Sequence, residues 1–178
     1  PDRGQGNPSA PASGPEITIG AMPQPSTPAF ESVRAARWLV VDDPGDWVER
    51  AATVRQHMAA LAKNGQDTAG FAGLLQEGER ARIAIPFRPA PGRTAYTPAS
   101  GEDVRDVPAG RALVVFPPKG DFAQRRAEGE RMLQQALEQK RLQAALPILV
   151  QPYLHLDEAT PDAAALATAT VRCSVMLR

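Results

Sequence analysis

Few side chains in this sequence could bind metal or attack a substrate. The two histidines are His57 and His155, and Cys173 is the single cysteine. None of them belongs to a cluster with the spacing of metal ligands, and one cysteine cannot form an internal disulfide. No Gly-x-Ser-x-Gly turn presents a serine nucleophile, and no glycine-rich phosphate loop opens a helix. The sequence therefore predicts neither a metal site nor a catalytic residue, and favours a protein that is not an enzyme.

Polar aromatic side chains are the better candidates for contact with a ligand. Tyr153 and His155 alternate with leucines, so a strand there would place both on one face. Tyr96, like Tyr153, combines an apolar ring with a polar tip. Since a haem site would depend on His155 alone as axial ligand, no cofactor is predicted.

Two arginines occupy matching positions in two similar segments, Arg82–Phe87 and Arg172–Leu177. A guanidinium in a ligand groove selects an anion; the alternative is that both arginines lie on the solvated side of an edge strand. Trp38 and Phe116 could line the same groove or pack in the core. The predicted ligand-binding set is Trp38, Arg82, Tyr96, Phe116, Tyr153, His155 and Arg172.

An internal repeat positions these residues. The segment 37–41 recurs 74 residues later as 111–115, and each copy is followed by a Pro/Gly turn. Asp46 and Asp121 then stand three residues before Glu49 and Gln124, which is the spacing of a helix capping box. The apolar spacing predicts helices over 46–62 and 121–141.

Two strands should follow each helix, near 71–76 and 81–87 and near 148–156 and 168–177. One β-α-β-β unit has too little core to stand alone. We therefore predict an α+β fold in which tandem pseudo-twofold β-α-β-β repeats form one antiparallel sheet with two helices on one face. The seam between the copies should form a groove.

Residues 1–30 are rich in Pro, Gly and Ser and are expected to be a disordered linker, with a short extended piece at 16–19. Residues 31–178 form the predicted domain, with repeat one at 31–90 and repeat two at 101–178. The leader preceding the domain, and a first residue that is not Met, favour an exported or periplasmic protein over a cytoplasmic one.

Three segments carry a resemblance to a known family: Val104–Val115, Lys119–Phe122 and Leu156–Pro161. They resemble the GyrI-like effector-binding domain and the related SOUL haem-binding family, which implies a bacterial small-molecule binder with its ligand between the repeats. Some members bind haem and a few are hydrolases. Many GyrI-like members have a Glu at the start of the last strand to meet a cation. This chain has Arg172 there, and Arg82 in the first copy, so an anionic ligand is expected.

The first functional hypothesis is thus non-enzymatic binding of a small organic ligand. An accessory protein-interaction domain tethered by the leader, and a small hydrolase using Glu79 or Glu158 as base, are the alternatives. Twenty basic and twenty acidic residues give zero net charge, which argues against nucleic-acid binding and permits a protein partner or homodimer. No apolar run is long enough to span a membrane.

Overall fold

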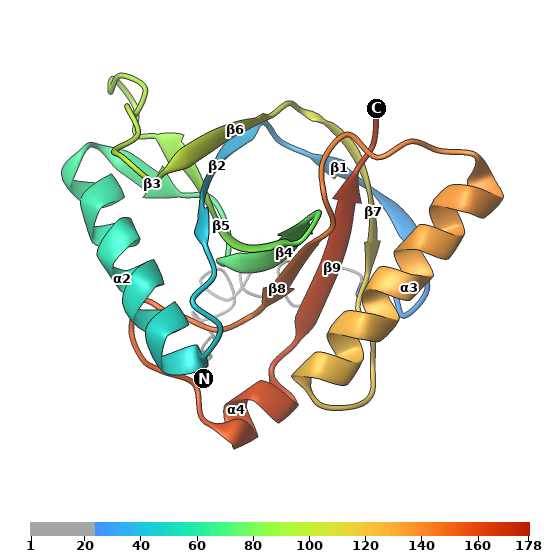
Figure 1. The fold of residues 1–178 in the computed structure, drawn as a ribbon. Coiled ribbons are helices and arrows are strands. Elements are labelled where there is room, and N and C mark those ends of the chain that lie inside the picture. The colour runs from blue at the N-terminus through green and yellow to red at the C-terminus, as the bar shows by residue number, and fades with distance from the viewer. Residues whose placement is uncertain (1–23) are drawn as a thin grey trace, which may run out of the picture.

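The structure is a computed structural model that describes residues 24–178. Its helices and strands run along the chain in the order shown in Figure 1. They are β1 (Ala29–Val33), β2 (Ala36–Asp42), α2 (Trp47–Lys63), β3 (Gln66–Thr68), β4 (Gly73–Glu77), β5 (Arg80–Pro89), β6 (Asp103–Val107), β7 (Gly110–Val115), α3 (Phe122–Lys140), β8 (Leu149–Pro152), α4 (Ala163–Thr168) and β9 (Val171–Met176).

All nine strands belong to one antiparallel sheet with the order β1-β7-β9-β8-β4-β5-β2-β6, and β3 pairs with β5 beside this path. The first repeat supplies β4-β5-β2 and the second supplies β8-β9-β7, so β4 and β8 meet at the seam. The register agrees with the sequence repeat, because Val41 faces Ile83 in the first copy and the equivalent Val115 faces the equivalent Cys173 in the second. The predicted α+β fold with tandem pseudo-twofold repeats is confirmed.

Both long helices begin where their capping residues predict. The Asp121 carboxylate accepts from the Gln124 N–H, and the Gln124 side chain accepts from the Asp121 N–H, which completes a capping box. Asp46 accepts from the Glu49 N–H at 2.9 Å, without a return bond. In Figure 1 α2 and α3 lie outside the curved sheet at its two ends.

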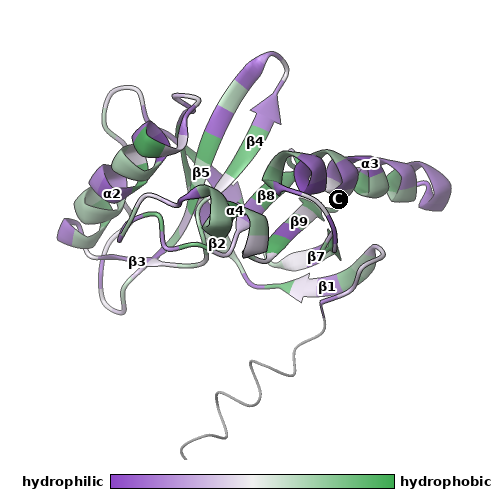
Figure 2. Cartoon of the chain, turned by 90° about the horizontal axis from the view of Figure 1, so that it is seen from below, coloured by the Kyte–Doolittle hydropathy of each residue, from purple (hydrophilic) through white to green (hydrophobic). Residues whose placement is uncertain are grey.

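Alternation along the strands divides the core into two layers. Leu39, Ile83 and Val175 face the helices, whereas their neighbours Val40, Ala84 and Met176 face the opposite, inner side. Figure 2 shows the alternation as bands of hydrophobic and hydrophilic residues along β4 and β5. An inner face with its own apolar layer is what a groove between the repeats requires.

The two outermost strands are exchanged between the repeats. β1 precedes β2 in the chain but pairs with β7, and β6 precedes β7 but pairs with β2. The predicted linker, residues 1–30, therefore overlaps a strand, since β1 begins at Ala29. Residues 1–23, including the expected extended piece at 16–19, lie outside the described residues.

Two predicted strands are shorter than expected. The strand predicted over 148–156 ends at Pro152, and the one predicted over 168–177 begins only at Val171 because α4 occupies 163–168. Tyr153 and His155 therefore lie in a turn, and strand alternation does not place them on one face. None of the described helices is both long and apolar enough to cross a membrane.

Candidate functional site

A groove of about 300 Å³ runs along the inner face of the sheet, between the two repeats. Its floor comes from β2, β5, β6, β8 and β9, one side comes from β1, and the segment 69–71 lines the other. Apolar side chains make up most of the floor, namely Trp38, Val107, Leu149 and Met176. Trp38 is only 6% exposed, so its indole contributes a buried flat surface to the floor.

Among the charged side chains of this groove, Arg172 makes the most hydrogen bonds to its neighbours. Its Nη1 donates to Gln151 Oε1 at 3.0 Å and to Ser174 Oγ at 3.1 Å, and its Nη2 donates to Glu31 Oε1 at 3.0 Å. Gln151 is itself fixed, because its Nε2 donates to the Phe71 carbonyl. Three of the five guanidinium hydrogens are therefore used within residues 24–178, which leaves Nε–H and one Nη2–H for a ligand.

Glu31 is a site residue that the sequence analysis missed. It lies on β1, and its carboxylate pairs with Arg172 across the groove. The side chains are 42% and 17% exposed respectively, so the pair lies at the solvent boundary. The residue types of Ala29–Val33 do not alternate in phase with their burial, since Phe30 is exposed and Glu31 faces the groove, so no sequence signal marks this strand and the proline-rich composition before it favours a linker.

Tyr153 forms an aromatic wall of the groove. Its ring stacks on Phe71 with centroids 4.7 Å apart, and Phe116 meets it edge-on at 6.1 Å. Burial raises the pKa of Tyr153; the Arg172 charge opposes that effect, and the Glu31 charge adds to it. Phe116 supports the wall and does not itself line the groove. The predicted residues Trp38, Tyr153 and Arg172 are thus brought together, with Phe116 behind them.

Arg82 lies away from the groove, although it faces the same side of the sheet. Only 4% of it is exposed, and its guanidinium lies 3.2 Å from Asp42 and 3.4 Å from Glu77. Its Nη2 donates to the Val40 carbonyl. These partners make Arg82 part of an ionic cluster in the first repeat.

Tyr96 lies on the helix side of the sheet, where its hydroxyl donates to Glu102 Oε1 at 2.7 Å. The other oxygen of Glu102 lies 2.6 Å from His57 Nδ1 on α2. Burial, followed by the Glu102 contact, raises the pKa of Tyr96 to about 12. Burial alone would raise the pKa of Glu102, but the Ala99 N–H, Tyr96 and His57 outweigh it and lower that pKa. This cluster joins the loop before β6 to α2 and does not reach the groove.

His155 is exposed and lines a different cavity, next to α2. Phe71 separates the two sites, since it stacks on Tyr153 and also contacts His155 at 5.3 Å between ring centroids. Cys173 is fully buried, and burial raises the pKa of its thiol to about 12, which makes it a poor nucleophile. Residues 24–178 hold no group of three or more His, Cys, Asp or Glu side chains that could bind a metal ion.

No protein-family model matches the sequence, and no curated protein matches it. Solved structures do share its fold. EcmrR in an EcmrR–DNA complex matches with a TM-score of 0.60 at 11% identity, over 96% of this chain and 64% of that one. The isolated EcmrR C-terminal domain matches with a TM-score of 0.54 at 11% identity, over 85% and 97% of the two chains.

A hydrolase from Listeria innocua matches with a TM-score of 0.50 at 11% identity, over 93% of this chain and 98% of that one. The fold is therefore GyrI-like, as the sequence motifs predicted, and at this identity the likeness extends to the fold alone. The match spans 64% of the EcmrR chain in the DNA complex and 97% of the isolated C-terminal domain.

Proposed function

We propose that this domain binds a small organic anion, without transforming it, in the groove between its two repeats. The proposal rests chiefly on Arg172, whose guanidinium is oriented by Gln151 and Ser174 and keeps two N–H groups directed to no partner within the described residues. A planar guanidinium with parallel N–H donors matches the geometry of a carboxylate.

The charge of the groove supports the same ligand class. Three arginines and one acid line it: Arg34, Arg88 and Arg172 against Glu31. A groove with this excess of positive charge attracts anions and repels cations. The departure from the GyrI-like pattern at Arg172 thus agrees with the charge of the whole groove.

The walls select the rest of the ligand. Trp38, Tyr153 and Met176 offer flat or polarisable apolar surface beside the charged group. A volume of about 300 Å³ is at the small end of ligand sites in general. An aromatic carboxylate of one or two rings combines these requirements. The shared fold with the C-terminal domain of EcmrR, and the effector-binding role that the GyrI-like resemblance implies, support a binding function.

A hydrolase is less well supported by the groove. Glu31 is the one carboxylate among the described residues that line it, and it is paired with Arg172 rather than free to take a proton from water. The alternative bases Glu79 and Glu158 are exposed and lie outside the groove.

Titration calorimetry with three ligands of one shape tests the proposal: naphthalene-2-carboxylate, naphthalene-2-methanol and naphthalen-2-ylmethylammonium. We expect the carboxylate to bind most tightly, and Arg172→Met to weaken it roughly 10- to 100-fold while the alcohol is little affected. Arg131→Met, on the exposed face of α3, is the matched control. Equal binding of all three ligands, or a carboxylate affinity that Arg172→Met does not change, would contradict the proposal.

A further inference from the structure

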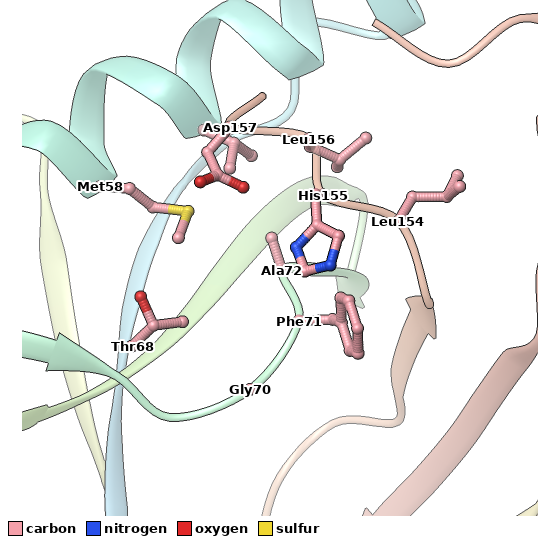
Figure 3. A pocket seen from close by; sticks show the side chains of 10 residues that line it. Met58, Thr68, Gly70, Phe71, Ala72, Leu154, His155, Leu156 and Asp157 are labelled. Carbon is pink, nitrogen blue, oxygen red and sulfur yellow. The ribbon is translucent and has the colours of Figure 1, made fainter. Parts of the chain in front are cut away.

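A second cavity, of about 220 Å³, lies on the helix side of the sheet between α2, β3 and the turn that follows β8. Figure 3 shows the side chains around it. Most of its lining is apolar, contributed by Val54, Met58, Phe71, Ala72, Leu154 and Leu156. In another protein, an apolar cavity of ~150 Å³ binds benzene, so this space admits a single six-membered ring with a short substituent.

One carboxylate is directed into this apolar cavity. The side chain of Asp157 lies between Met58 and His155 and points toward Ala72 (Figure 3). No arginine, lysine or histidine of residues 24–178 lies within ion-pair distance of that carboxylate. Arg55 approaches only the backbone, where its Nε donates to the Asp157 carbonyl at 3.3 Å. An ionised group beside apolar walls gains most from a ligand that brings the opposite charge.

We propose that this cavity, which we call the α2 cavity, is a second ligand site that binds a small organic cation with an apolar body. The ring of the ligand would occupy the space between Val54, Ala72 and Leu156, and its ammonium group would donate hydrogen bonds to Asp157. The Thr68 hydroxyl, which also lines the cavity, is a further acceptor. The α2 cavity therefore has the opposite charge preference to the groove.

The two sites share a wall but not a binding surface. Phe71 presents its ring to Tyr153 on the groove side and approaches His155 on the cavity side. Their charged groups, Arg172 and Asp157, come from different segments. Each site can therefore be probed separately, and the cation site does not depend on the proposed function of the groove.

Methionine methyl signals distinguish the sites. Of the four methionines, Met58 lines the α2 cavity, Met176 lines the groove and Met132 lies on α3, in neither; Met22 is outside the described residues. The protein is labelled with [13C-methyl]methionine, and each signal is assigned by a single Met→Leu change. It is then titrated with cyclohexylmethylammonium and, as its neutral isostere, cyclohexylmethanol.

We expect the ammonium ligand to shift the Met58 signal and to leave Met132 unchanged. Asp157→Asn should weaken the ammonium roughly tenfold and the alcohol less than about twofold. Glu158→Gln, which neutralises the exposed neighbour, should change neither affinity. Thr68→Phe, at an exposed position on the cavity rim, should abolish the Met58 response to both ligands while the protein stays folded.

Three results would overturn the inference: no Met58 response, equal ammonium affinity in the Asp157→Asn and parent proteins, or a response confined to Met176. The first two leave the groove proposal standing, because anion binding in the groove is measured separately by calorimetry with the carboxylate. Conversely, if the groove binds no carboxylate, the Met58 response to the ammonium ligand still tests the cation site independently.

Discussion

Replacing Glu31 by Gln should strengthen anion binding in the groove, although Glu31 is itself a groove residue. Its carboxylate occupies Nη2 of Arg172 at 3.0 Å, so a ligand carboxylate must displace it or share the guanidinium with it. A glutamine keeps the length and the acceptor oxygen and removes only the charge. The change therefore isolates the competition between Glu31 and the ligand for Arg172.

The size of the effect follows from the exposure of the pair. With side chains 42% and 17% exposed, Glu31–Arg172 resembles a surface ion pair, whose disruption costs about 0.2–1 kcal/mol. Removing a like charge a few ångströms from the bound anion adds about 0.5–1 kcal/mol at a solvent-exposed boundary. Together these give about 1–2 kcal/mol, which corresponds to roughly 5- to 30-fold tighter binding.

Calorimetry with naphthalene-2-carboxylate at low and high ionic strength measures this effect, and the gain should shrink as salt screens the charges. Asp106→Asn is the matched control, because it removes one acid from another exposed ion pair, with Arg37, that does not line the groove. Denaturant unfolding should show a stability change below about 1 kcal/mol in both variants. If Glu31→Gln weakens the carboxylate or leaves its affinity within twofold, Arg172 is not the group that binds it.

Three further predictions concern the stability of the fold. Gly73→Ala should lower the free energy of unfolding by about 1–3 kcal/mol in urea, because a Cβ there would lie 2.8 Å from the Val150 carbonyl across the seam. Gly129→Ala should destabilise α3 despite the better helix propensity of alanine, since its Cβ would overlap Cys173 Sγ, and Cys173→Ala in the same chain should recover part of the loss. Glu102→Gln should cost about 1–3 kcal/mol at neutral pH. The lowered pKa of Glu102 means that its contribution is present above about pH 4.5 and lost as the pH falls further, so the variant should lose less stability than the parent on acidification in pH-dependent urea unfolding.

The repeat could be predicted because both copies keep local signals. The two capping aspartates and the shared apolar segments 37–41 and 111–115 survive in the sequence, and the strands and helices that follow them appear in the structure. Strand ends were predicted less well. Leu154 and Leu156 continue an alternation typical of a strand, but Leu156 turns into the helix-side core after Pro152 ends the pairing.

The site was predicted only in part, because its composition depends on pairing between distant segments. Arg172 and Tyr153 are recognisable from type and position. Glu31 reaches the groove only because β1 pairs with the distant strand β7, where Glu31 faces Ala112. The sequence analysis predicts Tyr96 as a ligand contact, but Tyr96 lies with Glu102 and His57 on the helix side of the sheet, away from the groove. No local pattern carries that information.

The strand exchange also produces a difference in charge between the two repeats. By register, Arg105 on β6 faces Trp38 where Glu31 on β1 faces Ala112, so Arg105 is the pseudo-twofold counterpart of Glu31. The first repeat therefore has two arginines, Arg82 and Arg105, at the positions that Arg172 and Glu31 occupy in the second repeat.

Glu77 offsets the repulsion between Arg82 and Arg105, the two arginines of the first repeat. Its Oε1 lies 2.9 Å from Arg105 Nη2 and 3.4 Å from Arg82 Nη1, so one carboxylate joins both cations. The Arg105 contact, against the opposing effect of burial, holds the pKa of Glu77 below its ordinary value. Arg82 is only 4% exposed and lies against Glu77, Asp42 and the Val40 carbonyl, so its burial outside the groove keeps it from a ligand there. Glu31 is the one acidic partner of Arg172 among the described residues and lies at the solvent boundary. We therefore expect the second repeat, and not the first, to supply the positive charge that meets an anion in the groove.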